Sequence, residues 1–185
     1  RLCLFTAPAG FGKTTSIVQF LDGLPSSKNF TAWLRLDVTD NLPKRFLSNL
    51  ILSMVEAGMD MSELELAAKH GALDAPVQTI TAAILTHVER SLRSGGHLYA
   101  VLDDYHLAEN SELDECVELL LQANIPNFCL IISSRVKISL KLSNLRLSGQ
   151  ILEIGEEFLR FDESELLRLF GDTIDARQRN LLFEK

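Results

Sequence analysis

Short apolar runs recur along the chain and predict the strands of a sheet. Four of them are RLCLF (1–5), TAWLRL (31–36), LYAVL (98–102) and FCLII (128–132). Three of the four are almost continuously apolar, which is typical of parallel strands that are covered on both faces. The segment LRLSGQILEI (145–154) contains a predicted fifth strand together with the residues that lead into it.

Between these runs the apolar positions repeat with the period of an α-helix. Three apolar stripes predict helices over residues 46–55, 77–92 and 113–121. For the first helix, Pro43 suits the first turn, Gly58 suits the exit, and we expect Asp40 or Asn41 to act as the cap. Strands that alternate with helices predict βαβ units. The expected fold is therefore α/β, with a parallel sheet of about five strands and helices on both faces.

Two stretches of the chain are patterned less strongly. Residues 57–75 are compatible with either a loop or a short helix. Asp162 and Glu165 have the spacing of a capping box, which predicts that another helix begins there. The tail 175–185 also has a helical pattern.

Composition limits the classes of protein to be considered. A length of 185 residues fits one domain, or one domain with a fragment of the next. No apolar run is long enough to cross a bilayer, and no leader is recognisable, so we expect a cytoplasmic protein without a membrane contact. The net charge of −7 comes from acidic residues spread along the chain, which argues against a DNA-binding surface in this segment. Because the chain opens at Arg1 directly on a predicted strand, we expect a fragment of a longer protein.

The three cysteines, Cys3, Cys116 and Cys129, lie far apart in the sequence. They show neither the CxxC spacing nor a Cys/His pattern that a redox or metal site would need. We interpret them as small apolar side chains in a reducing compartment.

The segment TAPAGFGKTTS (6–16) follows the first predicted strand and precedes a helix. A glycine-rich loop at such a position can turn its backbone N–H groups inward around an anion, and the helix N-terminus adds partial positive charge. Lys13 would place its charge on the β- and γ-phosphates, and the Thr14 hydroxyl would bind Mg²⁺. This is the spacing of a P-loop, or Walker A motif. The residues expected to contact the nucleotide are Ala9, Gly10, Phe11, Gly12, Lys13, Thr14 and Thr15.

Ala7 departs from the P-loop pattern, because the motif has glycine at that position. Alanine is tolerable there if its φ is negative. The alternative for the whole segment is a glycine-rich turn with a solvated lysine, and the predicted strand before it and helix after it favour the P-loop.

The segment LYAVLDDYH ends an apolar strand with the acid pair Asp103 and Asp104, the pattern of a Walker B motif. Asp103 would reach Mg²⁺ through water, and Asp104 could orient or deprotonate the attacking water. Paired acids at the end of a strand are more often a solvated turn, and it is the combination with the P-loop that indicates a nucleotide site.

Arg135 follows the fourth predicted strand, at the edge where open α/β sheets bind ligands. It could sense or stabilise a γ-phosphate, or it could be a surface arginine. None of the four histidines has metal-ligand spacing. For His106, next to the acid pair, we expect a structural hydrogen bond rather than proton transfer.

Taken together, these segments resemble the nucleotide-binding domain of the MalT-type, LuxR-family transcription regulators, ATP-dependent bacterial activators of the STAND class of P-loop NTPases. The residues that carry the resemblance are TAPAGFGKTT, AWLRLDVTDN with Phe46 after it, VLDDYHLA, LIISSR and LRLSGQILEI…FLRFDESE. They occur in the family's order over nearly the whole chain.

The resemblance implies roles for individual residues. Lys13 and Thr14 would bind phosphate and Mg²⁺, Asp103 would be the Walker B metal ligand, Asp104 the catalytic carboxylate and Arg135 the sensor arginine. In such regulators ATP binding, usually with a small-molecule inducer bound elsewhere, drives self-association, and hydrolysis resets the switch. A separate C-terminal helix-turn-helix binds DNA. The matching family motif around Asp40 and Asn41 implies no chemical role.

The resemblance also divides the chain. Residues 1–155 would be the P-loop domain, and 156–185 the start of a helical region that continues in the family. The leading hypothesis is an ATP-binding, weakly hydrolysing switch domain with ATP and Mg²⁺ as its cofactors. The alternatives are a mechanical AAA+-like ATPase and a scaffold that does not use nucleotide. The acidic net charge and the Asp, rather than Glu, at position 104 argue against the mechanical ATPase.

Overall fold

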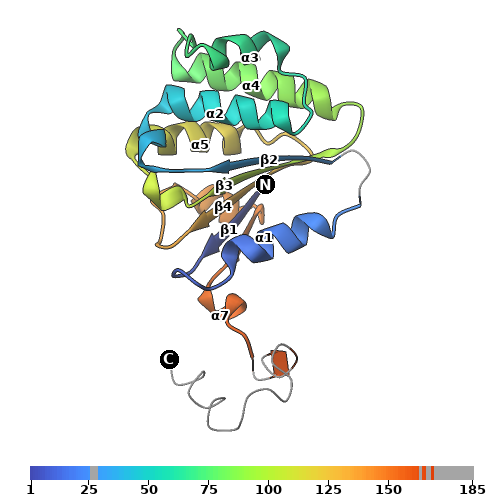
Figure 1. The fold of residues 1–185 in the computed structure, drawn as a ribbon, viewed down its shortest axis with the longest axis vertical. Helices are drawn as coiled ribbons and strands as arrows, with labels where there is room; N and C mark the ends of the chain where they lie inside the picture. The colour runs from blue at the N-terminus through green and yellow to red at the C-terminus, as the bar shows by residue number, and fades with distance from the viewer. Residues whose placement is uncertain (26–28, 163, 166–167, 169–185) are drawn as a thin grey trace.

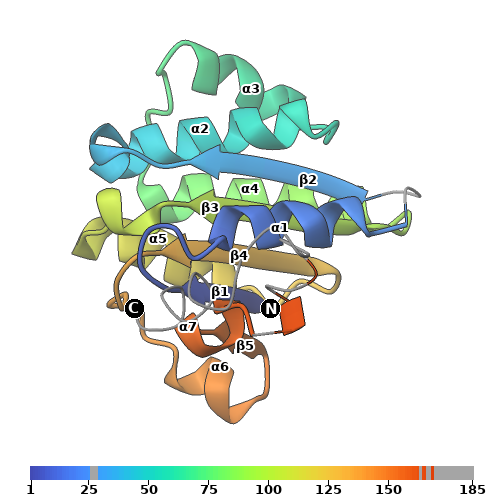
Figure 2. The same ribbon diagram turned by 60° about the horizontal axis from the view of Figure 1, so that its bottom comes forward.

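The computed structural model describes residues 1–25, 29–162, 164–165 and 168. Its centre is a five-stranded sheet in which every pairing is parallel. The strands are β1 (Leu2–Thr6), β2 (Asn29–Arg35), β3 (His97–Asp103), β4 (Phe128–Ser134) and β5 (Ile151–Ile154). Their order across the sheet is β2-β3-β4-β1-β5, which Figure 2 shows from top to bottom. The predicted parallel α/β sheet is thus confirmed.

The register of the strands aligns their carboxyl ends at one edge. Arg35 of β2 pairs with Asp103 of β3, and Thr6 of β1 pairs with Ser134 of β4. Residues that directly follow these four strands therefore meet at one edge of the sheet, where ligands of open α/β sheets bind.

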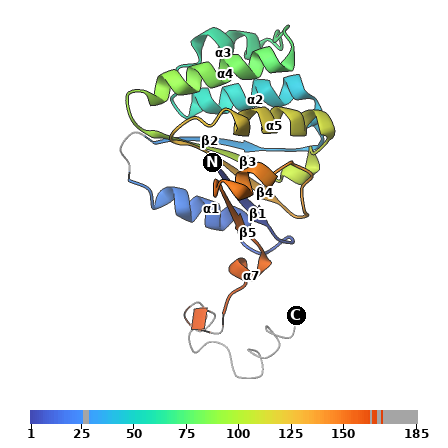
Figure 3. The ribbon, with the colours of Figure 1, turned by 180° about the vertical axis from the view of Figure 1, so that it is seen from behind.

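Helices cover both faces of the sheet, but unequally. The helices α2 (Pro43–Glu56), α4 (Val77–Leu92) and α5 (Ser111–Gln122) lie on one face, and α3 (Ser62–Lys69) packs outside them against α2. The helix α1 (Lys13–Asp22) lies on the opposite face. Figures 1 and 3 show these layers from opposite sides.

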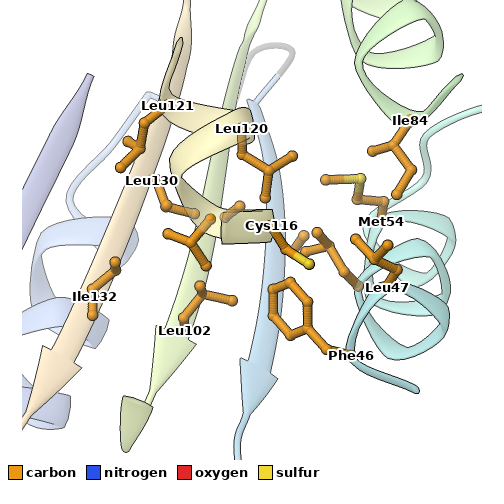
Figure 4. Close-up of a cluster of buried hydrophobic side chains, with 14 of the residues drawn as sticks. Phe46, Leu47, Met54, Ile84, Leu102, Cys116, Leu120, Leu121, Leu130 and Ile132 are labelled. Carbon is orange, nitrogen blue, oxygen red and sulfur yellow. The ribbon is translucent and has the colours of Figure 1, made fainter. Parts of the chain in front are cut away.

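The larger core lies between the sheet and the layer of α2, α4 and α5, and Figure 4 shows its side chains. Phe46, Leu47 and Ile84 are fully buried there, and Leu102 and Leu130 face them from β3 and β4. Each such side chain contributes about 1.5–3 kcal/mol by leaving water. The intervening strand residues face α1 and form a smaller cluster, in which Ile17 of α1 packs with Phe5, Val101 and Ile131.

The α1 face is covered less completely. A groove of about 850 Å³ runs beside β1 and β5 between α1 and α7 (Glu156–Leu159). Its wall includes Phe20, Leu152 and Phe158, which are 50%, 59% and 72% exposed. The side chains of the larger core on the other face of the sheet, in contrast, are buried.

One expectation about local structure needs correction. The N-cap of α2 is Leu42, and neither Asp40 nor Asn41 caps that helix. The Asp40 carboxylate instead accepts from the backbone N–H of Asp37, the N-cap of the 3₁₀ turn η1 (Val38–Asn41), and from Asn49 Nδ2 at 2.7 Å. The segment that leads into β5 contains a short helix, α6 (Ser143–Leu147).

Other expectations are confirmed. Residues 57–75 contain the helix α3, one of the two possibilities. Asp162 and Glu165 form the predicted capping box: each backbone N–H donates to the other side chain, at 2.9 and 2.8 Å. Most of the helix expected after residue 162, and the whole of the tail 175–185, lie outside the described residues. Among the described residues, no helix is long and apolar enough to span a membrane.

Candidate nucleotide-binding site

The predicted P-loop joins β1 to α1 and has the backbone that an anion cradle needs. Gly10 and Gly12 have φ of 88° and 74°, a conformation that residues with a Cβ rarely adopt. Gly12 is also the N-cap of α1, so the first turn of that helix opens toward the loop. Ala7 is not among the positive-φ residues of the described chain, which satisfies the condition for alanine in place of the first glycine.

Lys13 points into its own loop. The residue is 7% exposed, and Nζ donates to the carbonyl oxygens of Ala7 at 2.6 Å and Pro8 at 2.9 Å. Burial lowers the pKa of Lys13, and the nearby Arg135 guanidinium lowers it further, while Asp104 and Asp103 act in the opposite direction. The ammonium therefore lies inside the loop, where it can neutralise an anion.

Thr14 and Asp103 bring two oxygen groups together from different elements. Thr14 Oγ1 at the start of α1 lies 3.2 and 3.3 Å from the two carboxylate oxygens of Asp103 at the end of β3. Ser133 of β4 donates its hydroxyl to the same carboxylate. A hydroxyl and a carboxylate are ligands suited to Mg²⁺, which keeps waters and phosphate oxygens as its other ligands. The described residues contain no group of three or more His, Cys, Asp or Glu that could hold a metal by themselves.

Asp104 is buried and held in an unusual backbone conformation. Its φ and ψ of 57° and 37° are left-handed, which Asp tolerates better than most residues. Its backbone N–H donates to Ser133 Oγ at 3.1 Å. Each carboxylate oxygen faces one arginine: Oδ2 lies 3.5 Å from Arg35 Nε, and Oδ1 lies 3.6 Å from Arg135 Nε. The acid pair is thus part of a charged cluster rather than a solvated turn.

Arg135 directly follows β4 and is anchored through its main chain. Its backbone N–H donates to His106 Nδ1 at 3.4 Å, while its side chain stays 48% exposed. Burial lowers the pKa of His106, which favours the neutral imidazole that accepts this bond. The contact agrees with the structural hydrogen bond expected for His106.

The structure brings most of the sequence-predicted site residues together. Lys13, Thr14, Asp103, Asp104 and Arg135 come from three strand ends and meet at the carboxyl edge of the sheet. The carboxyl ends of the strands and the P-loop lie at the left of Figure 2.

Asp40 and Asn41 do not join this group. The contacts of Asp40 lie within η1 and α2, and the Asn41 carbonyl accepts from Asn110 Nδ2 at the start of α5 at 2.7 Å. In this structure the two residues connect η1 to neighbouring helices.

Sequence reasoning missed two members of the site, Arg35 and Ser133. Ser133 is the second-to-last residue of β4, and Arg35 is the last residue of β2. The signal that could have found them is their place at strand ends, since parallel strands align their carboxyl ends at one edge.

Fold and site together define the class: the chain is an α/β domain of the P-loop NTPase type. Its sequence is 35% identical over 174 residues to the HTH-type transcriptional regulator MalT of Serratia proteamaculans, a match that covers 92% of this chain. The chain belongs to the MalT-type, LuxR-family regulators of the STAND class. It spans only 18% of the length of that relative.

Other comparisons add little to this. No family model matches the chain. A structure of Drosophila ORC bound to AT-rich DNA and Cdc6 is 12% identical with a TM-score of 0.49, and covers 100% of this chain and 61% of that one. A structure of C. elegans PCH-2 is 13% identical with a TM-score of 0.40, and covers 95% and 42%. At these values the likeness carries no conclusion about this chain.

Proposed function

We propose that this chain is an ATP-binding, slowly hydrolysing switch domain of a bacterial LuxR-family transcription activator. The observation that carries the proposal is the convergence of the buried Lys13 ammonium with the Thr14–Asp103 oxygen pair at the mouth of a glycine-rich loop. A cation for phosphate and two oxygens for Mg²⁺ are the chemistry that a Mg·nucleotide requires.

The P-loop would bind the phosphates. Lys13 now donates to two carbonyls of its own loop, and those bonds would be exchanged for β- and γ-phosphate oxygens. Backbone N–H groups of Ala9 through Thr15 would complete the cradle, with the helix terminus of α1 behind them. Thr14 and Asp103 would hold Mg²⁺, which neutralises part of the phosphate charge when bound.

The geometry of Asp104 supports a slow rather than a fast hydrolysis. Both of its carboxylate oxygens face arginines, Arg35 and Arg135, at 3.5 and 3.6 Å. A carboxylate whose two oxygens both face arginines has no free oxygen to accept a hydrogen bond from the attacking water, so hydrolysis would wait until Arg135 turns to the γ-phosphate.

The rest of the proposal extends beyond the described residues. We propose that residues 1–155 form the switch and that 156–185 begin the next, helical region. In the whole protein, ATP binding would promote self-association in the cytoplasm, with a small-molecule inducer bound elsewhere and DNA bound by a C-terminal module. The name of the relative, an HTH-type transcriptional regulator, supports this assignment.

Calorimetric titration of the chain with Mg·ATP and Mg·ADP tests the phosphate site. We expect micromolar binding, and Lys13→Ala should weaken it by at least about tenfold, because a buried charge on the phosphates is lost. Lys69→Ala is the matched control, since Lys69 is exposed on α3 and pairs with Glu65.

Three results would count against the proposal. Equal affinity of the wild type and Lys13→Ala would remove the assignment of the phosphate site, and no binding at millimolar nucleotide would favour the scaffold. Steady-state turnover of several ATP per second would favour a mechanical ATPase instead.

A further inference from the structure

Arg35 is a third cation at the proposed site, and neither the P-loop nor the acid pair accounts for it. It is the last residue of β2, and the sheet register pairs it with Asp103 of β3. Its backbone therefore lies beside the residue that precedes Asp104. Its guanidinium reaches across to Asp104 Oδ2, while 75% of the side chain stays exposed. Arg135 faces the other oxygen of the same carboxylate.

The two arginines pair with different oxygens of the Asp104 carboxylate. Arg35 faces Oδ2 and Arg135 faces Oδ1, and the Asp104 side chain is only 13% exposed. Removing both cations would leave a mostly buried carboxylate without a partner, which is costly. If one arginine leaves, the other still compensates the charge.

We propose that Arg35 determines the preference of this site for a triphosphate over a diphosphate. Arg35 keeps Asp104 compensated, which allows Arg135 to leave the carboxylate and turn to the γ-phosphate at small cost. Without Arg35, Arg135 is the arginine that remains beside Asp104. The carboxylate then binds Arg135 more tightly, and releasing Arg135 to the γ-phosphate costs more. The inference rests on the proposed nucleotide site, and it adds to that site a residue acting through Asp104 rather than on the nucleotide.

The effect should appear as a change in selectivity and not in overall affinity. A diphosphate has no γ-phosphate, so its binding does not depend on releasing Arg135. We therefore expect Arg35→Gln to leave the Kd for Mg·ADP unchanged and to raise the Kd for a non-hydrolysable Mg·ATP analogue about three- to fivefold, the range of a partly exposed ion pair.

A double-mutant cycle measures the coupling directly. Mg·ADP and Mg·adenylyl imidodiphosphate are titrated into the wild type, Arg35→Gln, Asp104→Asn and the double variant. In the Asp104→Asn background the carboxylate that faces Arg135 is lost, so adding Arg35→Gln should no longer change the ratio of the two dissociation constants. Arg35→Lys keeps a cation at that position and should retain most of the wild-type ratio.

Arg93→Gln is the matched control. Arg93 has a 73% exposed side chain and pairs with Glu89 on α4, away from the site, so its replacement should leave both affinities unchanged. An unchanged ratio in Arg35→Gln, or an equal loss for both nucleotides, would overturn the inference while Lys13-dependent binding still upheld the nucleotide site. If the wild type bound neither nucleotide, or if Lys13→Ala bound as the wild type does, the proposed function itself would fail and this inference with it.

Discussion

At the scale of single residues, a buried hydrogen bond supports the segment that carries the acid pair. Tyr105, fully buried in the turn η2 (Tyr105–Leu107), donates its hydroxyl to Asp114 Oδ1 of α5 at 2.6 Å. Burial raises the pKa of Tyr105 and also that of Asp114, although the bond from Tyr105 lowers the latter. This bond connects Tyr105, which follows the acid pair, to the helix α5.

This pair makes a prediction about pH. Because the pKa of Asp114 is higher in the folded chain than in the unfolded one, folding retains a proton there, and stability falls as the pH rises from about 4 through the raised value. Asp114→Asn cannot titrate and still offers an oxygen to Tyr105. We expect the stability of the wild type relative to Asp114→Asn to decline over this pH range in urea unfolding. A difference that is constant or grows with pH would contradict the assignment.

At the scale of elements, α2 is anchored through its first turns. Phe46 and Leu47 are fully buried against the sheet, although α2 begins without a side-chain cap. Its position therefore depends on the apolar stripe rather than on capping, as is usual for helices in globular proteins.

Replacing the anchor tests this view. Phe46→Ala should lower the free energy of unfolding by about 3–5 kcal/mol, because the larger core cannot fully close around the missing ring. Phe158→Ala is the matched control: its ring is 72% exposed on α7, and the change should stay within about 0.5 kcal/mol. Chemical denaturation of both variants measures the difference, and equal losses would mean that α2 is not anchored by Phe46.

At the scale of the whole molecule, charge sets the expected partners. The net charge of −7 repels the negatively charged phosphate backbone of DNA. The cations of the site are already paired with Asp104 or with loop carbonyls. This agrees with a segment whose nucleic-acid contacts, if the proposed function holds, belong to another part of the protein.

A DNA-binding assay follows from this charge. We expect the purified chain to give no sequence-specific gel shift with DNA at physiological salt, with or without Mg·ATP, because counterion release needs a cluster of free cations. A sequence-specific shift by this chain alone would contradict the expectation.

Much of the fold and part of the site were readable from the sequence, because the signals are local. Apolar runs and helical stripes predicted the five strands and the helices α2, α4 and α5. Glycines, a lysine and a threonine after a strand predicted the loop, and an acid pair at a strand end predicted the second half of the site. Each pattern spans a few residues, within which backbone geometry decides the spacing.

The tertiary structure decided what depends on strands that are distant in the sequence. The order β2-β3-β4-β1-β5 places β4 between the P-loop strand and the strand of the acid pair, so that Ser133 contacts Asp103. The register of β2 against β3 puts Arg35 beside Asp104, a contact between residues that no local pattern links. The sequence alone determined the strands, the main helices and the residue types that we propose for phosphate and Mg²⁺. Only the packing of the sheet decided which charges meet, since pairing between strands depends on the whole core.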